Sequence, residues 1–199
     1  MLLVGLTGGL ASGKSSVAKI FKELGCHIIH ADDLGHEALL PAGEAYAPAV
    51  AEFGPGILNE DQTINRKALA AIVFNDPQQL AKLNAIVHPV VGRLQQSCIA
   101  EIAARDANAI VVVEAAIHIE TGNWKRYQKL ILAVCTEEQQ IVRAMARDNA
   151  TREEVLARMA RQMPLADKRK FAGYVIDTSG TQAATRAQTV EVYNALRGI

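Results

Sequence analysis

The sequence predicts an α/β fold of three layers, in which a mostly parallel sheet lies between helices. Short apolar runs alternate along the chain with longer segments of helical periodicity. The first apolar run leads directly into a glycine-rich segment and then into a helical pattern. Strands that alternate with helices in this way form parallel sheets covered on both faces. The chain has 199 residues, half of them apolar, which is the size of one compact unit.

The opening strand and helix are predicted from two local patterns. Leu2 to Leu6 form a continuous apolar run that ends at glycines, as expected for a strand buried on both faces. After the glycines, apolar residues recur at helical spacing, and Gly25 stands where a helix closes with a left-handed residue. The residues of this apolar face are Val17, Ile20, Phe21 and Leu24.

Later apolar runs continue the predicted sheet. They are short, several are rich in β-branched residues, and they stand between helical stretches. The runs are Cys26 to Ile29, Ala109 to Val113, Leu130 to Val134 and Tyr174 to Ile176. Ligands of parallel sheets bind outside the carboxyl ends of the strands, so we expect the functional residues directly after these runs.

The segment Gly8 to Ser15 matches the phosphate-loop pattern G-x-x-x-x-G-K-[ST] in full. Its setting between strand and helix predicts a P-loop NTPase fold, in which main-chain N–H groups surround phosphate oxygens. Lys14 is expected to reach the β- and γ-phosphates of ATP, and Ser15 to offer its hydroxyl to Mg²⁺. A flexible glycine turn is the weaker alternative. The predicted ATP-binding residues of this segment are Gly9, Leu10, Ala11, Ser12, Gly13, Lys14, Ser15 and Ser16.

Carboxylates follow two of the predicted strands. Asp32 and Asp33 come after the second strand, where one of them either orients or deprotonates an acceptor hydroxyl or caps the helix expected from Leu34. Spacing alone leaves these two alternatives open. Glu114 follows the third strand, where phosphate-loop enzymes keep a carboxylate near magnesium, usually through water. An exposed glutamate at a strand end is the competing interpretation of Glu114.

A helical lid is predicted at about residues 143–168. Two capping-box patterns mark helix starts, namely Thr136 with Gln139 and Thr151 with Glu154. The expected apolar positions are Ile141, Val142 and Met145 in the first helix and Val155, Leu156, Met159 and Met163 in the second. Arg143 and Arg147 share another face, from which lid arginines hold triphosphate oxygens. A solvated basic face is the alternative for any single arginine.

The region between the second and third strands predicts a helical substrate-binding insertion at about residues 34–105. The core of the single kinase unit is then 1–33 and 106–199. Within the insertion, His88 precedes Pro89, a pair typical of a turn, and Arg93 follows shortly after.

Composition excludes several classes of protein. Lysines and arginines number 21, as do aspartates and glutamates, so no overall positive charge attracts nucleic acid or an anionic membrane. No apolar stretch is long enough to span a bilayer. The three cysteines are odd in number and fit no zinc-ligand spacing, which favours reduced thiols in a cytoplasmic protein.

With these residues in view, the chain resembles the dephospho-coenzyme A kinases over almost its whole length. The family opens with a phosphate loop like Gly5 to Ser15 and follows its second strand with a D-A-D segment, here His30-Ala31-Asp32. Further matching segments are Leu83 to Pro89, Glu120 to Gly122, Gln139 to Arg147, Gln162 to Pro164 and Tyr174 to Asp177. Several independent segments agree in order, which is more specific than the phosphate loop alone.

The resemblance implies a reaction and roles for the residues. ATP would phosphorylate the ribose 3′-hydroxyl of dephospho-coenzyme A, with Asp32 as the base and with Lys14 and Arg143 at the transferring phosphoryl group. Magnesium would contact Ser15 and, through water, Glu114. The acceptor-binding residues implied are Thr7, Asp32, His88 and Arg93. We expect a monomer or small homo-oligomer with no nucleic-acid or membrane partner.

The chain departs from the family pattern at several positions. His30 replaces the first aspartate of D-A-D, Ala116-Ile117-His118 replaces a proline-leucine-leucine segment, and Gly92 stands one position before Arg93 where an arginine is usual. Gly173 and Thr178 replace a late aspartate and asparagine. These departures bear on how the acceptor and adenine are held. A kinase for another small acceptor, such as a nucleoside monophosphate, and a nucleotide-gated binding protein that transfers to no acceptor are the alternative functions.

Overall fold

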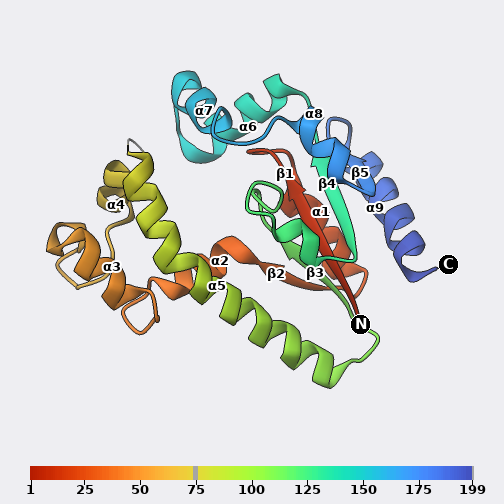
Figure 1. Ribbon diagram of the computed structural model, residues 1–199. Coiled ribbons are helices and arrows are strands. Elements are labelled where there is room, and N and C mark those ends of the chain that lie inside the picture. Colours follow the sequence, from red (N-terminus) through yellow and green to blue (C-terminus); the bar gives the residue numbers. More distant parts are fainter. Residues whose placement is uncertain (74–75, 199) are drawn as a thin grey trace. The chain divides into compact units, whose positions relative to one another are not determined.

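A computed structural model describes residues 1–73 and 76–198 (Figure 1). Two compact units make up the chain, the first formed by Met1–Ile29 with Ile102–Ile199 and the second by His30–Glu101. The helical insertion predicted at about residues 34–105 overlaps this second unit, and its limits as a substrate-binding segment stay a prediction. In the described part of the chain, no helix is both long and apolar enough to cross a membrane.

The first unit is built on a five-stranded sheet with the order β2-β3-β1-β4-β5. β1 pairs in parallel with β3 and β4, and β4 pairs in parallel with β5. The strands are β1 Leu2–Gly8, β2 His27–His30, β3 Ile110–Glu114, β4 Lys129–Val134 and β5 Tyr174–Asp177. The α/β fold with a parallel sheet is thus confirmed, and each strand lies within one or two residues of its predicted limits.

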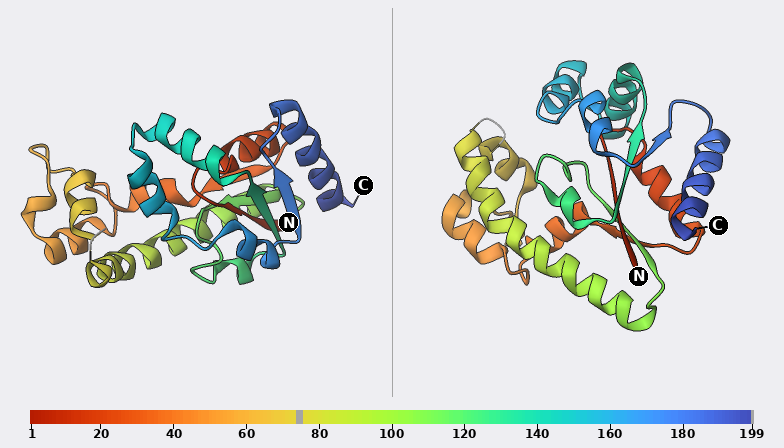
Figure 2. Two further views of the ribbon diagram at one scale, coloured as in Figure 1. Left: turned by 90° about the horizontal axis from the view of Figure 1, so that it is seen from above. Right: turned by 45° about the vertical axis from the view of Figure 1, so that its right-hand side comes forward.

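Alternating side chains of the sheet form the main core with two helices. Val4 and Leu6 of β1 are fully buried and pack with Phe21 of α1 (Lys14–Glu23) and with Val192 of α9 (Gln182–Arg197). Figure 2 shows α1 and α9 side by side on this face of the sheet. On the other face, Gly5 faces the Tyr127 ring. Burial of both faces explains why the central strands are continuously apolar.

Three α-helices lie between β4 and β5, and the first two begin with the predicted caps. They are α6 Glu137–Asp148, α7 Arg152–Met159 and α8 Leu165–Lys168. Thr136 caps α6 and Thr151 caps α7, and in both cases the reciprocal glutamine or glutamate completes the capping box. The predicted apolar faces are wrong at three positions. Val142 is 56% exposed, Leu156 is 40% exposed, and Met163 lies beyond the end of α7 at Met159. Gln140 and Ala144 are buried in α6 instead.

The second unit consists mainly of helices around its own apolar clusters. These helices are α2 Ala31–Ala38, α3 Tyr46–Phe53, α4 Arg66–Val73 and α5 Pro77–Arg105, whose last residues belong to the first unit. Ala49, Ile57 and Leu69 form part of one cluster. The turn predicted at His88 and Pro89 is wrong, because both residues lie inside the 29-residue helix α5. The apolar residues around Val90 bury the helix there and offset the hydrogen bond that proline removes.

Candidate active site

The phosphate-loop segment leaves β1 and enters α1 through two left-handed residues. Ala11 has φ of 52° and Gly13 has φ of 85°. Gly13 occupies the N-cap of α1, where no side chain caps the helix. A Cβ at Gly13 would lie 2.6 Å from the Thr178 hydroxyl, so both the backbone and the space require glycine. A helix start without a side-chain cap is suited to an anion, because its N–H groups and its dipole both favour negative charge.

A cavity of about 200 Å³ lies over this helix start. Its lining consists of Ala11 to Ser16 together with Arg143 and Arg147 of α6. The two arginines predicted from sequence therefore border the same cavity as the phosphate loop. Within the loop, the Lys14 ammonium donates to the Gly9 carbonyl at 2.9 Å.

Ser15 and Glu114 face each other beside the phosphate loop. The Ser15 hydroxyl donates to Glu114 Oε1 at 3.1 Å, and Glu114 is only 9% exposed. The interpretation of Glu114 as an exposed residue at a strand end is therefore wrong. A hydroxyl and a carboxylate at this separation suit Mg²⁺, which prefers oxygen ligands and keeps water in its coordination shell. Among residues 1–73 and 76–198, no group of three His, Cys, Asp or Glu could hold a metal by itself.

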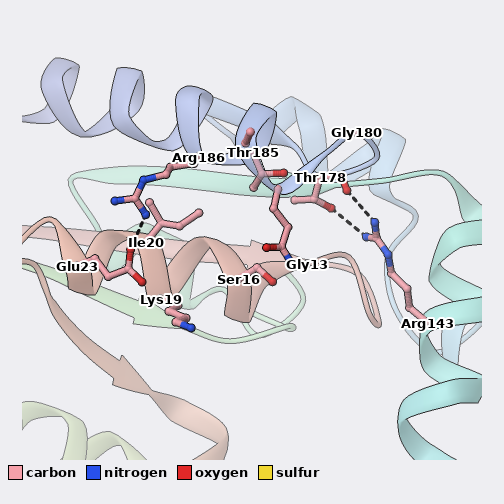
Figure 3. A pocket seen from close by; sticks show the side chains of 12 residues that line it. Gly13, Ser16, Lys19, Ile20, Glu23, Arg143, Thr178, Gly180, Thr185 and Arg186 are labelled. Carbon is pink, nitrogen blue, oxygen red and sulfur yellow. Dashed lines mark hydrogen bonds and ion pairs between the residues drawn. The ribbon is translucent and has the colours of Figure 1, made fainter.

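Arg143 is held in place by the segment that follows β5. Its guanidinium donates to the Thr178 hydroxyl at 3.2 Å and to the Thr178 carbonyl at 2.8 Å (Figure 3). The buried Thr178 hydroxyl also lies 2.9 Å from the Ser12 carbonyl and 3.1 Å from the Val134 carbonyl, to either of which it can donate. Thr178 thus connects β4, the phosphate loop and Arg143.

A larger cavity of about 530 Å³ continues from the phosphate cavity. It lies between α1 and α9 and includes Gly13, Ser16 and Arg143, which also line the smaller cavity. Figure 3 shows Arg143 and Thr178 at one end of this cavity and Lys19 and Glu23 farther along α1. The two cavities together offer space for a phosphate chain and an attached organic group.

Arg147 makes an ion pair next to the phosphate cavity. Its guanidinium binds both carboxylate oxygens of Asp148 at 2.7 and 2.9 Å, and Arg158 of α7 binds the same carboxylate at 2.5 Å. The hydrogen bond from Arg147 outweighs burial and, with Arg158, holds the pKa of Asp148 far below its usual value. Asp148 therefore stays ionised and keeps α6 and α7 joined near the cavity.

The residues predicted to bind the acceptor fall into both units. Thr7 is fully buried in β1 and donates to the Ala116 carbonyl at 3.2 Å. Asp32, His88 and Arg93 belong to the second unit. Arg93 pairs with Glu44 at 2.5 Å, and His88 is exposed on α5. The roles of these four residues therefore stay predictions.

The helix-cap interpretation of Asp32 and Asp33 is wrong. Helix α2 begins at Ala31, not at Leu34, and His30 occupies its N-cap without a side-chain hydrogen bond. Both aspartates lie in the first turn of α2 and are exposed. Acidic residues there interact favourably with the helix dipole.

A buried lysine near the phosphate loop was not predicted from the sequence. Lys168 of α8 is fully buried, and its ammonium donates to the Ala116 carbonyl at 2.6 Å and to the Gly8 carbonyl at 3.4 Å. It also pairs with Glu120 at 2.8 Å. Lysines are rarely buried and nothing local distinguishes this one, so no sequence signal pointed to it.

His118 is also buried, between β3 and Tyr127. Its Nε2 lies 2.9 Å from the Val113 carbonyl, and its Nδ1 lies 3.3 Å from the Tyr127 hydroxyl. A carbonyl only accepts, so Nε2 carries the proton and Nδ1 accepts from the tyrosine. Burial lowers the pKa of His118 to about 4, so the ring is neutral at physiological pH.

The parallel sheet, the phosphate loop at the carboxyl end of β1, and two arginines over the same cavity define a P-loop kinase. A solved structure from Thermus thermophilus is 32% identical, covers 98% of this chain and 96% of its own, and has a TM-score of 0.83. The dephospho-CoA kinase from Campylobacter jejuni is 27% identical, covers 98% of both chains and has a TM-score of 0.71. A shikimate kinase from Acinetobacter baumannii, 17% identical with a TM-score of 0.54, shares the fold; the match covers 100% of this chain and 94% of its own.

The sequence relatives narrow this class. The dephospho-CoA kinase from Geobacter metallireducens is 44% identical over 193 residues, which cover 97% of this chain and 96% of that protein. The dephospho-CoA kinase from Halalkalibacterium halodurans is 39% identical over 191 residues, covering 96% and 94%. The model of the dephospho-CoA kinase family matches residues 2–184. The chain therefore belongs to the dephospho-CoA kinase family.

Proposed function

We propose that this protein transfers the γ-phosphoryl group of ATP to the 3′-hydroxyl of dephospho-coenzyme A, which yields coenzyme A and ADP. The observation that carries the proposal is the pairing of Ser15 with Glu114 beside a complete phosphate loop, in a chain of this family. The phosphates of ATP would occupy the cavity over α1, and its base would occupy the larger cavity between α1 and α9.

The residues of this chain supply positioning and charge. Main-chain N–H groups of the loop and the Lys14 ammonium bind the phosphate oxygens, and Arg143 neutralises charge that develops on the transferring group. Ser15 and Glu114 would hold Mg²⁺, which would neutralise negative charge on the phosphates. Asp32 accepts the proton of the 3′-hydroxyl while that oxygen bonds to the γ-phosphorus. The bond between the γ-phosphorus and the bridging oxygen breaks, and ADP leaves.

Acceptor-dependent release of ADP tests this function. With dephospho-coenzyme A we expect ADP and coenzyme A in equal amounts, and with nucleoside monophosphates only background release. Faster release with a nucleoside monophosphate would favour a different small-molecule kinase. Release that no acceptor accelerates would favour a nucleotide-gated binding protein.

The role of Asp32 has a matched control in its neighbour. Asp32→Asn should lower turnover by about 10² to 10⁴, the range for losing a general base, while the affinity for ATP is retained. Asp33→Asn removes an equally exposed charge from the same helix turn and should keep turnover within about threefold of the natural protein. Near-normal turnover of Asp32→Asn would remove Asp32 from the mechanism.

We further propose that the enzyme acts in the cytoplasm as a monomer or small homo-oligomer. All three cysteines are free thiols, and Cys26 is buried, where its environment raises the pKa to about 11. Burial is the main cause of this shift and makes the thiol unreactive. The balanced charge of the chain offers nothing to attract nucleic acid or an anionic membrane.

A further inference from the structure

The main chain of Leu10, inside the phosphate loop, is held on both sides by side-chain amides. Its N–H donates to Gln162 Oε1 at 2.9 Å, and its carbonyl accepts from Gln140 Nε2 at 2.6 Å. Gln140 lies in α6 and is 5% exposed, whereas Gln162 follows α7 and is half-buried. A backbone N–H only donates and a carbonyl only accepts, so the orientation of each amide is fixed.

The side chain of Leu10 strengthens this attachment. It is 8% exposed and packs with Ile141 and Ala144 of α6 and with Val155 of α7. Gly9 makes room for the arrangement, because a Cβ there would lie 2.3 Å from Gln140 Nε2. One residue of the phosphate loop is therefore bound to α6 and to the segment after α7 by two hydrogen bonds and by burial of its side chain.

The loop needs such support because its conformation is unfavourable on its own. Ala11, directly after Leu10, is a left-handed alanine with φ of 52°. A non-glycine residue in this region is strained and persists only where its surroundings fix it. The same loop lines the phosphate cavity, so its main-chain geometry determines how the N–H groups meet an anion.

We propose that Gln140 and Gln162 are positioning residues, which hold the phosphate loop through Leu10 in the conformation that receives the triphosphate. The phosphate loop, the first turn of α6 and the segment after α7 then move together. Any opening of the lid occurs in the residues between these two attachment points. The inference rests on the proposed function only in taking ATP as the ligand. Neither glutamine is proposed to contact the substrate.

The two glutamines have opposite hydrogen-bonding requirements, which gives a matched set of variants. Gln162 accepts, so Gln162→Glu keeps an acceptor and should behave like the natural protein, whereas Gln162→Leu should not. Gln140 donates, so both Gln140→Glu and Gln140→Leu remove the donor and should be impaired. In the impaired variants we expect the KM for ATP to rise about tenfold, the usual effect of one buried hydrogen bond, and the KM for the acceptor to stay within about twofold.

Two measurements separate positioning from a merely structural role. Steady-state assays give both KM values and kcat, and thermal unfolding with and without MgATP gives the nucleotide-dependent rise in Tm. We expect this rise to shrink in Gln162→Leu and to be retained in Gln162→Glu. A lower Tm with unchanged KM for ATP would overturn the proposal, as would equal defects in both Gln162 variants.

The outcomes remain distinct from those that test the function. If the natural protein binds MgATP but phosphorylates no acceptor, the proposed function fails, and the MgATP-dependent rise in Tm still tests the two glutamines. If the natural protein transfers normally and all four variants match it, this inference alone fails. Should the Gln140 variants not fold, the half-buried Gln162 pair decides the question.

Discussion

At the scale of single residues, local spacing was enough to identify the phosphate loop but not its supports. The positions of Gly13, Lys14 and Ser15 could be predicted because the motif is contiguous. The contacts of Thr178 with Ser12 and Arg143 could not, because they join segments far apart in sequence. Partners brought together by the fold alone leave no local pattern.

His118 illustrates a departure from the family pattern that the structure explains. It replaces an expected apolar residue and stays neutral, donating to the Val113 carbonyl and accepting from Tyr127. Tyr127 in turn packs against Gly5, where a Cβ would lie 2.5 Å from the ring. The histidine therefore acts as a packing residue whose two polar atoms are both satisfied.

The buried His118 predicts a pH-dependent stability. Its pKa of about 4 in the folded protein lies below the ordinary value of 6.5 because burial disfavours the charged ring. Between these values the unfolded chain binds a proton that the folded chain does not. The free energy of unfolding should therefore fall with decreasing pH below about 6.5, by about 2 kcal/mol at about pH 5, and should not change for this reason above pH 7.

Urea unfolding at about pH 7.5 and pH 5 checks this contribution. His118→Leu should be less stable at both pH values because the Tyr127 hydroxyl loses its acceptor. Its stability difference between the two pH values should nevertheless be about 2 kcal/mol smaller than that of the natural protein. Equal pH dependence in the two proteins would contradict burial of a neutral ring.

Glu114 carries a second prediction at this scale. Glu114→Gln keeps a hydrogen-bonding partner for Ser15 but removes the negative charge beside the expected magnesium position. Half-maximal activity should then require about tenfold more Mg²⁺, the usual effect of changing a group that orients the ligands of a metal. Chelation of magnesium should abolish ADP release in both proteins. An unchanged magnesium titration would place the metal elsewhere.

At the scale of elements, the sequence predicted strands better than helix surfaces. The three central strands are mostly buried and all five contain a short apolar run, so this pattern needs no knowledge of what covers them. The faces of α6 and α7 are less regular, because these helices bury Gln140 at the phosphate loop and leave Val142 exposed. The turn predicted at Pro89 is wrong for a related reason, because packing of the long helix α5 outweighs the loss of one hydrogen bond.

Lys168 joins three elements, and its removal should destabilise the protein strongly. Lys168→Met would leave Glu120 and the Ala116 carbonyl without their ammonium partner. Lys168 is fully buried whereas Glu120 is partly exposed, so the loss should cost at least the roughly 1–3 kcal/mol of leaving buried hydrogen-bonding groups without a partner. Lys170→Met is the control, because Lys170 pairs with Asp167 while its side chain is 73% exposed, and the change should stay within about 0.5 kcal/mol. Equal denaturation midpoints of the two variants would contradict the structural role of Lys168.

At the scale of the whole molecule, the residues expected to bind ATP and most of those expected to bind the acceptor belong to different units. The first unit contains both cavities assigned to ATP, together with Ser15, Glu114 and Arg143. The second unit contains three of the four predicted acceptor-binding residues, including Asp32. The sequence suggested such a division through the helical region between the second and third strands, but it could not place the acceptor.

Hydrogen exchange can test this division directly. A ligand that binds only the folded state stabilises the part that it contacts, by about 2.7 kcal/mol at a hundredfold excess over its Kd. A non-hydrolysable MgATP analogue should therefore slow amide exchange in residues 8–16 and α6, and leave α2 unchanged. Addition of dephospho-coenzyme A should then slow exchange in the first turn of α2, around Asp32. Protection confined to the first unit would show that the acceptor does not bind at Asp32, and it would leave the proposed ATP site unchanged.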